Sequence, residues 1–174
     1  MPERFLLALV GRLERDVSIP AVCTGSHGDG CALVSFMWPL ARAKAEAFWR
    51  GVRASMARGE CIMLAARDAQ GRASGTVQVV LVQPESQPHH GDLCKMLVHR
   101  WARRHGIGAA LMQAAKAQAL AAGKTLLVLD TASADAERLY ARSGWVACGR
   151  IPGYALLPGG EPCATPLFYK QLQA

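Results

Sequence analysis

The sequence has no hydrophobic run long enough to cross a membrane, for which a helix needs about 20 apolar residues. The only apolar run near its start covers residues 5–10, and the acidic Glu3 and Glu14 around it do not fit a signal peptide. We therefore expect a cytoplasmic protein that does not use a membrane as its partner.

The cysteines form no CxxC pair and show no regular spacing. The six are Cys23, Cys31, Cys61, Cys94, Cys148 and Cys163. Zinc sites and disulfide frameworks use recurring spacings, so neither is indicated, and we expect reduced, mostly buried thiols. His89 and His90 are adjacent but have no third ligand at a recognisable spacing. We therefore expect no metal site.

The sequence also lacks a basic run interleaved with aromatic residues, which is typical of a surface on which nucleic-acid bases stack. It nevertheless has 20 Lys and Arg against 13 Asp and Glu, a formal net charge of +7. This balance favours an anionic partner, which could be nucleic acid, a membrane surface or a polyphosphate cofactor. Because the arginines are spread over several segments, we do not expect nucleic acid.

With 174 residues, of which 51% are hydrophobic, the chain has the size and composition of one globular domain, residues 1–174. The spacing of apolar residues predicts a first helix at 5–17. Turn-forming residues predict a surface loop at 19–30, and an Ala-rich stretch at 40–56 is helical by propensity. The first part of the chain is thus predicted to be mainly helical.

The remainder of the chain carries alternating strand and helix signals. Stretches at 61–66 and 73–82, with AQGR between them, predict an antiparallel hairpin. Further predicted elements are a strand at 92–98, a helix from 107 to a cap at Gly123, a strand at 125–129, a helix capped by Ser133, strands at 145–151 and 167–172, and a long loop at 152–164. A right-handed crossover should make strand 125–129 parallel to strand 92–98. We therefore predict an α/β fold with a mixed sheet and helices on both faces.

A strand, a basic glycine turn and the start of a helix follow one another in residues 93–111, LCKMLVHRWARRHGIGAAL. The first amides of a helix are unpaired and carry partial positive charge, so this arrangement binds anions. Gly106 and Gly108 allow positive φ and let a ligand approach bare backbone, while Arg103 and Arg104 add mobile charge. We infer a phosphate cradle at this turn.

The turn RRHGIG, residues 103–108, matches the signature R/Q-x-x-G-x-G/A. It follows MLV at residues 96–98 and precedes the element A-x-x-L-Y-x-x-x-G-W at residues 136–145. Together these motifs resemble the GNAT superfamily of N-acetyltransferases, in element order over residues 41–172. The tail PGYALLPGG and the LDT that precedes it in the chain most resemble the tabtoxin-resistance type of small-molecule acetyltransferase.

The resemblance implies a GNAT-like mixed, mostly antiparallel sheet of about six to seven strands, and acetyl-CoA as acetyl donor. It places the strand before the turn against the pantetheine and thioester, the amides of the turn on the pyrophosphate, and Tyr140 at the sulfur. The implied cofactor-binding residues are Met96, Leu97, Val98, Arg103, Arg104, His105, Gly106, Ile107, Gly108, Ala109, Ser133 and Tyr140. Ser133 stands where the family often has Asn, and Trp145 where Phe is usual.

Acetyl transfer to an amine needs a base for the amine proton and an acid for the leaving thiolate. Asp92 is a candidate base because two-residue alternation puts it on the same strand face as Val98. Asp130, at the end of the neighbouring parallel strand, is the other. Tyr140 is the candidate acid, since a phenol of pKa about 10 stays protonated at pH 7. The candidate substrate-binding residues are Phe36, Trp38, Asp92 and Asp130.

The predicted function is acetyl-CoA-dependent N-acetyltransfer to a small-molecule amine, such as an amino-acid-like toxin or antibiotic, by direct attack on the thioester. Two alternatives stay open: a protein or peptide N-acetyltransferase, and a non-catalytic acyl-CoA-binding module. A Rossmann-type nucleotide domain fits less well, because the glycine motif lies in mid-chain after a hairpin. The sequence leaves the oligomeric state open, and a homodimer is one of the options.

Overall fold

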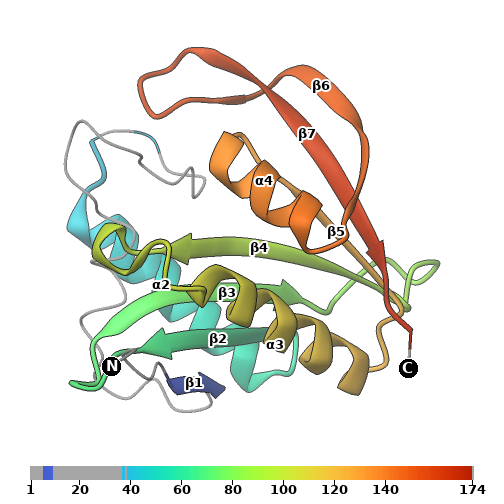
Figure 1. The fold of residues 1–174 in the computed structure, drawn as a ribbon, viewed down its shortest axis with the longest axis horizontal. Helices are drawn as coiled ribbons and strands as arrows, with labels where there is room; N and C mark the ends of the chain where they lie inside the picture. Colours follow the sequence, from blue (N-terminus) through green and yellow to red (C-terminus); the bar gives the residue numbers. More distant parts are fainter. Residues whose placement is uncertain (1–5, 10–36, 38, 174) are drawn as a thin grey trace.

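The structure, a computed structural model, describes residues 6–9, 37 and 39–173 (Figure 1). Its strands are β1 (Leu6–Leu9), β2 (Cys61–Arg67), β3 (Ala73–Val80), β4 (His90–Val98), β5 (Leu126–Asp130), β6 (Val146–Leu156) and β7 (Pro162–Gln171). Its helices are α2 (Arg42–Ala57), α3 (Ile107–Ala121) and α4 (Ala134–Arg142), with a short 3-10 helix, η1 (Arg100–Ala102), before α3.

The strands form one seven-stranded sheet in the order β1-β2-β3-β4-β5-β7-β6. Strands β4 and β5 are parallel, and every other neighbouring pair is antiparallel. The β2–β3 hairpin and the crossover from β4 through α3 to β5 are both as the sequence predicts. The predicted α/β fold with a mixed, mostly antiparallel sheet is therefore confirmed.

Helix α2 covers one face of the sheet, and α3 and α4 cover the other (Figure 1). Two hydrophobic cores result, because successive residues of a strand point to opposite faces. Met63 packs in the core under α2, whereas its neighbour Leu64 packs in the core under α3. We refer below to the α2 face and the α3/α4 face of the sheet.

The predicted first helix at 5–17 is wrong for the part that the structure describes, since Leu6–Leu9 is strand β1. This strand pairs with the edge of β2, Leu6 opposite Arg67 and Leu9 opposite Leu64. Backbone pairing with an existing sheet edge overrides the apolar spacing that favours a helix. The rest of that stretch and the predicted loop at 19–30 lie outside the described residues.

The predicted long loop at 152–164 is also wrong, because β6 and β7 continue through most of it as a hairpin. The connection is short and closes with a hydrogen bond from the amide of Leu157 to the carbonyl of Glu161, at 2.8 Å. Strand β6 pairs only with β7 and so forms a sheet edge, where Pro152 and Gly153 are tolerated beside a register shift. The ribbon projects beyond α4 in Figure 1.

The helices of the second half match their predicted ends. Helix α3 stops at Ala121, and Gly123 follows with φ 78°, a conformation that favours glycine after a helix. Helix α4 begins after Ser133, whose hydroxyl oxygen accepts a hydrogen bond from the amide of Ala136 at 3.5 Å. None of the helices among residues 39–173 is long and apolar enough to span a bilayer.

The cysteines that the structure describes are free thiols but are not mostly buried, so that part of the prediction is wrong. Cys61, Cys94 and Cys163 are half-buried, and Cys148 on β6 is exposed. Cys148 is exposed because β6 is an edge strand whose side chains are almost all exposed.

Candidate active site

The parallel strands β4 and β5 pair only over their first residues. His90, Gly91 and Asp92 pair with Leu126, Leu127 and Val128, and the remainder of β4 is bonded to β3 alone. The two strands diverge toward the ends from which α3 and α4 follow (Figure 1). Ligands of sheets with parallel strands bind beyond such carboxyl ends, so the functional site is expected here.

The predicted phosphate cradle lies at one side of this divergence, where η1 leads into α3. Gly106 precedes the first helical residue with φ 77°, and Arg104 also has a positive φ, 66°. Within the described part of the chain no side chain caps α3, and a Cβ atom on Gly106 would meet no atom within 4 Å. The first amides of α3 are thus left without a protein cap beside open space, which fits a phosphate group.

Gly108 does not have the backbone conformation predicted for it. It lacks a positive φ, unlike Gly106. A Cβ atom on Gly108 would lie 3.1 Å from Cδ2 of Leu139, so the missing side chain lets the first turn of α3 pack against α4. Close packing of the two helices therefore accounts for glycine here, and the contact of Gly108 with a cofactor stays a prediction.

The basic side chains of the turn are partly tied to the protein. Arg103 donates from Nε to the carbonyl of Val98 at 3.3 Å and so connects the turn to the end of β4. The ring Nδ1 of His105 lies 2.8 Å from the carbonyl of Arg103. All three side chains from Arg103 to His105 remain exposed, as residues that meet a soluble anion must be.

Asp92 and Val98 do not share a face of β4, contrary to the prediction. Between Cys94, which pairs with Gln78, and Leu97, which pairs with Thr76, β4 contains one residue more than β3. This β-bulge, at which Lys95 has φ 51°, reverses the alternation of side chains beyond it. Asp92 therefore faces the α2 side, whereas Val98 packs into the core under α3.

Tyr140 lies on α4 and is only 4% exposed. Its ring packs against those of Trp145, at 6.0 Å between centroids, and Phe168, at 5.7 Å. Burial raises the pKa of its hydroxyl well above the ordinary value, and nearby Asp130 and Cys94 raise it further. Tyr140 is thus within electrostatic range of Asp130 and Cys94, and its phenol is held in the protonated form.

The two candidate bases have different surroundings. Asp130 is exposed at the end of β5, beside Tyr140. Asp92 accepts a hydrogen bond from Nε2 of Gln83 at 2.8 Å, and Nε2 of His90 lies 3.1 Å from its other oxygen at an angle that gives no hydrogen bond. Asp92 also sits where β4 is still paired with β5. Of the two carboxylates, Asp130 is therefore the one at the open end of the strands.

Ser133 has a clear structural role, because its hydroxyl caps the start of α4. Its own amide donates to Oγ1 of Thr131 at 3.1 Å, which fixes the link from β5 to α4. The other end of α4 is held by Lys170, whose Nζ donates to the carbonyls of Ser143 at 2.8 Å and Gly144 at 2.9 Å. Both ends of the helix that carries Tyr140 are thus fixed.

Sequence reasoning missed Cys94. Its thiol pKa is raised by burial, lowered by Lys95, and raised again by Asp92 and Asp130. It is therefore within electrostatic range of both candidate bases and of Tyr140. The available signal was its place two residues after Asp92, on the same strand face.

The remaining predicted site residues cannot be placed in the same way. Phe36 and Trp38 lie outside the described residues. Within the part of the chain that the structure describes, no group of three His, Cys, Asp or Glu side chains could hold a metal ion.

The model of the acetyltransferase (GNAT) family matches residues 32–145, more than half of the chain. The chain belongs to the GNAT acetyltransferase family. The match includes β4, the cradle, α3, β5 and Tyr140, and so covers the part of the sheet where β4 and β5 diverge.

Solved structures of such enzymes share the fold over nearly the whole chain. An N-acetyltransferase from Staphylococcus aureus Mu50 is similar with a TM-score of 0.79 at 14% identity, over 98% of this chain and 99% of that chain. The protein yncA from Salmonella typhimurium, with its cofactor acetyl-CoA, has a TM-score of 0.77 at 15% identity, over 98% of this chain and 95% of that chain. A GNAT phosphinothricin acetyltransferase from Sinorhizobium meliloti, in complex with acetyl-CoA, has a TM-score of 0.74 at 19% identity, over 99% of this chain and 89% of that chain.

Proposed function

We propose that this GNAT acetyltransferase transfers an acetyl group from acetyl-CoA to the amine of a small molecule, with Tyr140 as acid and Asp130 as base. One observation carries the proposal. The uncapped start of α3 and the Tyr140–Asp130 pair lie at the same open end of β4 and β5, on either side of the divergence.

The cradle fits the pyrophosphate of coenzyme A. The amides at the start of α3, from Ile107 onward, would bind it together with the exposed Arg103, Arg104 and His105. Met96, Leu97 and Val98, beyond the bulge, would lie along the pantetheine. Acetyl-CoA supplies the acetyl group as an activated thioester. The protein's task is then to orient the amine and move two protons.

Tyr140 is suited to act as the acid. Its raised pKa keeps the phenol protonated at neutral pH, so it can donate a hydrogen bond to the sulfur as negative charge develops there. The conjugate acid of the leaving thiolate has a pKa of about 8.5, below that of the phenol, so full proton transfer is uphill and the phenol must regain its proton before the next turnover. The packing against Trp145 and Phe168 fixes the direction of the ring. The fixed ends of α4 hold the helix in place.

Asp130 is favoured as the base that removes the proton from the acceptor amine, directly or through water. Amines of pKa about 8 to 10 are mostly protonated at pH 7, so this step is needed before attack. Asp130 is exposed to an incoming amine and adjoins Tyr140, whereas Asp92 is engaged by Gln83.

A small amine is favoured as acceptor by two similarities. The tail motif resembles the tabtoxin-resistance type, and phosphinothricin acetyltransferases are among the similar folds. An amino-acid-like toxin or antibiotic is thus the first class to test, and use of acetyl-CoA supports a reaction in the cytoplasm. A ribosomal-protein-alanine N-acetyltransferase from Brucella melitensis also shares the fold, at 21% identity. Peptide N-termini are therefore the acceptor class against which small amines should be compared.

The test is release of free thiol from acetyl-CoA in the presence of amino acids, phosphinothricin-like amino acids, aminoglycosides, polyamines and short peptides. Turnover with a small amine, at a kcat/KM at least tenfold above that of any peptide, is expected. Preference for peptide N-termini would overturn the small-molecule assignment. Tight acetyl-CoA binding by calorimetry without any thiol release would instead indicate a non-catalytic module.

A further inference from the structure

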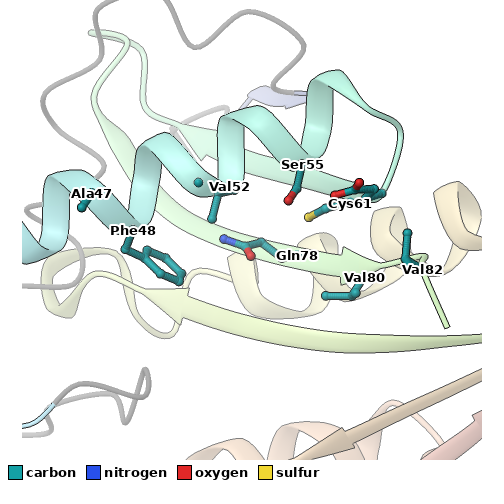
Figure 2. Close-up of a pocket in the computed structure, with 10 residues that line it drawn as sticks. Ala47, Phe48, Val52, Ser55, Cys61, Gln78, Val80 and Val82 are labelled. Carbon is teal, nitrogen blue, oxygen red and sulfur yellow. The ribbon is translucent and has the colours of Figure 1, made fainter. Parts of the chain in front are cut away.

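A groove of about 410 Å³ runs between α2 and strands β2 and β3, on the α2 face of the sheet (Figure 2). This volume lies within the usual range for small-molecule sites, about 300–1,000 Å³. Its walls are mostly apolar and include Phe48, Val52, Val80 and Val82. The cradle for the cofactor's phosphates is at the start of α3, on the other face, so the groove is not part of it.

One buried polar group in the groove has no partner. The side chain of Gln78 lines the groove and is only 4% exposed, and among the described residues its Nε2 atom has no hydrogen-bond acceptor. Figure 2 shows this amide between β3 and α2. A buried donor without an acceptor is costly, by about 1–3 kcal/mol. A ligand that brought a carbonyl oxygen to this nitrogen would remove that cost.

Small residues of α2 keep the groove open. Gly51 lines it in mid-helix, and a Cβ atom added there would meet nothing within 4 Å. Glycine at an internal helix position is unfavourable by about 1 kcal/mol relative to alanine. Ala47 and Ser55, one turn before and after Gly51, also line the groove. The space is thus maintained by the sequence of α2.

The charges near the groove are compensated. Glu60 at one end is held by Arg58, through Nε at 2.6 Å and Nη2 at 2.7 Å. Near Phe48, the Nζ atom of Lys95 lies 5.6 Å from the centre of the phenyl ring. The interior between these ends offers an amide donor and apolar side chains. An uncharged occupant is therefore favoured over an ionic one.

The groove is two strands away from Asp130, because Gln78 is on β3, Asp130 is on β5 and β4 lies between them. Gln78 pairs directly with Cys94 across β3 and β4, and directly paired residues share a face. Burial, with a contribution from Cys94, raises the pKa of the groove residue Cys61 to about 11. Cys94 also contributes to the raised pKa of Tyr140. Cys94 is thus on the strand that lies between Gln78 of the groove and the strand that carries Asp130.

We propose that this groove binds the acceptor's body: an uncharged apolar arm that carries a carbonyl group, with the reacting amine beside Asp130. This inference rests on the proposed function and narrows its substrate class to amines with an apolar, amide- or ester-like arm. The carbonyl accepts a hydrogen bond from Nε2 of Gln78. The alkyl part then occupies the space beside Gly51.

The experiment uses N-alkylamides of 4-aminobutanoic acid, from N-methyl to N-hexyl, as acceptors in the thiol-release assay. Gln78 on β3 and Asp130 on β5 are two inter-strand spacings apart, about 10 Å, which the four-carbon chain and a hydrogen bond of about 2.9 Å at each end can span. For the wild-type protein, kcat/KM is expected to rise by up to about fourfold per methylene until the groove is filled. Gly51→Leu, which fills the groove, should abolish this gain, and Gly51→Ala should reduce it.

Ala54→Leu is the matched control, because Ala54 is an exposed residue of the same helix and does not line the groove. It should keep the wild-type dependence on chain length. Gln78→Leu should lower kcat/KM for the N-hexylamide at least tenfold relative to 1-aminodecane, which lacks the carbonyl. A flat series in the wild type, or an unchanged dependence in Gly51→Leu, would overturn the groove assignment.

A binding measurement separates this inference from the proposed function. Equilibrium dialysis with N-hexylacetamide, which has no amine, should show binding by the wild type and at least tenfold weaker binding by Gly51→Leu. If the N-methylamide is acetylated but chain length has no effect, the groove assignment fails and the proposed function stands. If no amine is acetylated, the proposed function fails. In that case, binding of N-hexylacetamide would still support a site for apolar amides in the groove. A lack of binding would overturn the groove assignment as well.

Discussion

Asp92 and Val98 lie on opposite faces of β4, because the strand has one extra residue between Cys94 and Leu97. Val98 therefore belongs with the cradle on the α3/α4 face, while Asp92 and Cys94 belong to the α2 face. A donor held on one face and an acceptor that enters from the other can meet where β4 and β5 diverge. The bulge thus separates the two halves of the proposed site.

The first prediction concerns the choice of base. Asp130→Asn should lower kcat/KM for the amine by about 100-fold, because the amide cannot take the amine proton. Asp92→Asn should change it by less than about fivefold, since its carboxylate is engaged by Gln83. Steady-state kinetics over pH 6 to 9 would show this, and the rate of Asp130→Asn should recover toward high pH, where the amine is already neutral. The reverse ranking would assign the base to Asp92.

The second prediction concerns Tyr140. Tyr140→Phe should lower kcat by about 100-fold while acetyl-CoA affinity changes little, because only the proton donor is lost. The phenyl ring can keep its packing against Trp145 and Phe168. Tyr154→Phe is the matched control, since Tyr154 is 53% exposed on β6. Thiol-release kinetics and calorimetry would measure the two effects, and an unchanged kcat would remove Tyr140 from the mechanism.

Local patterns were sufficient for much of the fold. The hairpin at AQGR and the cap at Gly123 depend on residues close in sequence, and both were predicted. The bulge at Lys95 was not, because nothing in the residue types of β4 shows where its pairing with β3 shifts. That shift reversed the expected face of Asp92 relative to Val98. Pairing between strands, which a single sequence does not display, determines the face of Asp92. It also determines that Leu6–Leu9 is strand β1 rather than part of a helix.

The candidate site, like the fold, was predictable where it depends on local sequence motifs and not where it depends on tertiary pairing. The glycine turn and Tyr140 follow recognisable motifs, and the structure places them on either side of the divergence of β4 and β5. The groove with Gln78 and Gly51 was not predictable, because it forms between a helix and strands far apart in the chain. A glutamine in a strand gives no sign that its amide will lack a partner.

The third prediction is a loss of stability at alkaline pH. The folded protein holds the Tyr140 proton more tightly than the unfolded chain, whose tyrosine pKa is about 10. The pKa of Cys61 is likewise raised, from 9.0 to about 11. The unfolded state therefore loses these protons first, so stability is fully present below about pH 9 and falls as pH rises further. Urea denaturation from pH 8 to 11 should show the fall, reduced above pH 10 in Tyr140→Phe but not in Tyr154→Phe.

The fourth prediction tests the contact between α3 and α4. Gly108→Ala should reduce the free energy of unfolding by about 1–3 kcal/mol, because the new Cβ atom would lie 3.1 Å from Cδ2 of Leu139. In a Leu139→Ala background the contact is absent, and the same substitution should then be neutral or stabilising by up to about 1 kcal/mol, as expected from helix propensity alone. Urea denaturation of the wild type, both single variants and the double variant would give the coupling energy. Equal effects of Gly108→Ala in the two backgrounds would show that the contact with Leu139 does not explain the glycine.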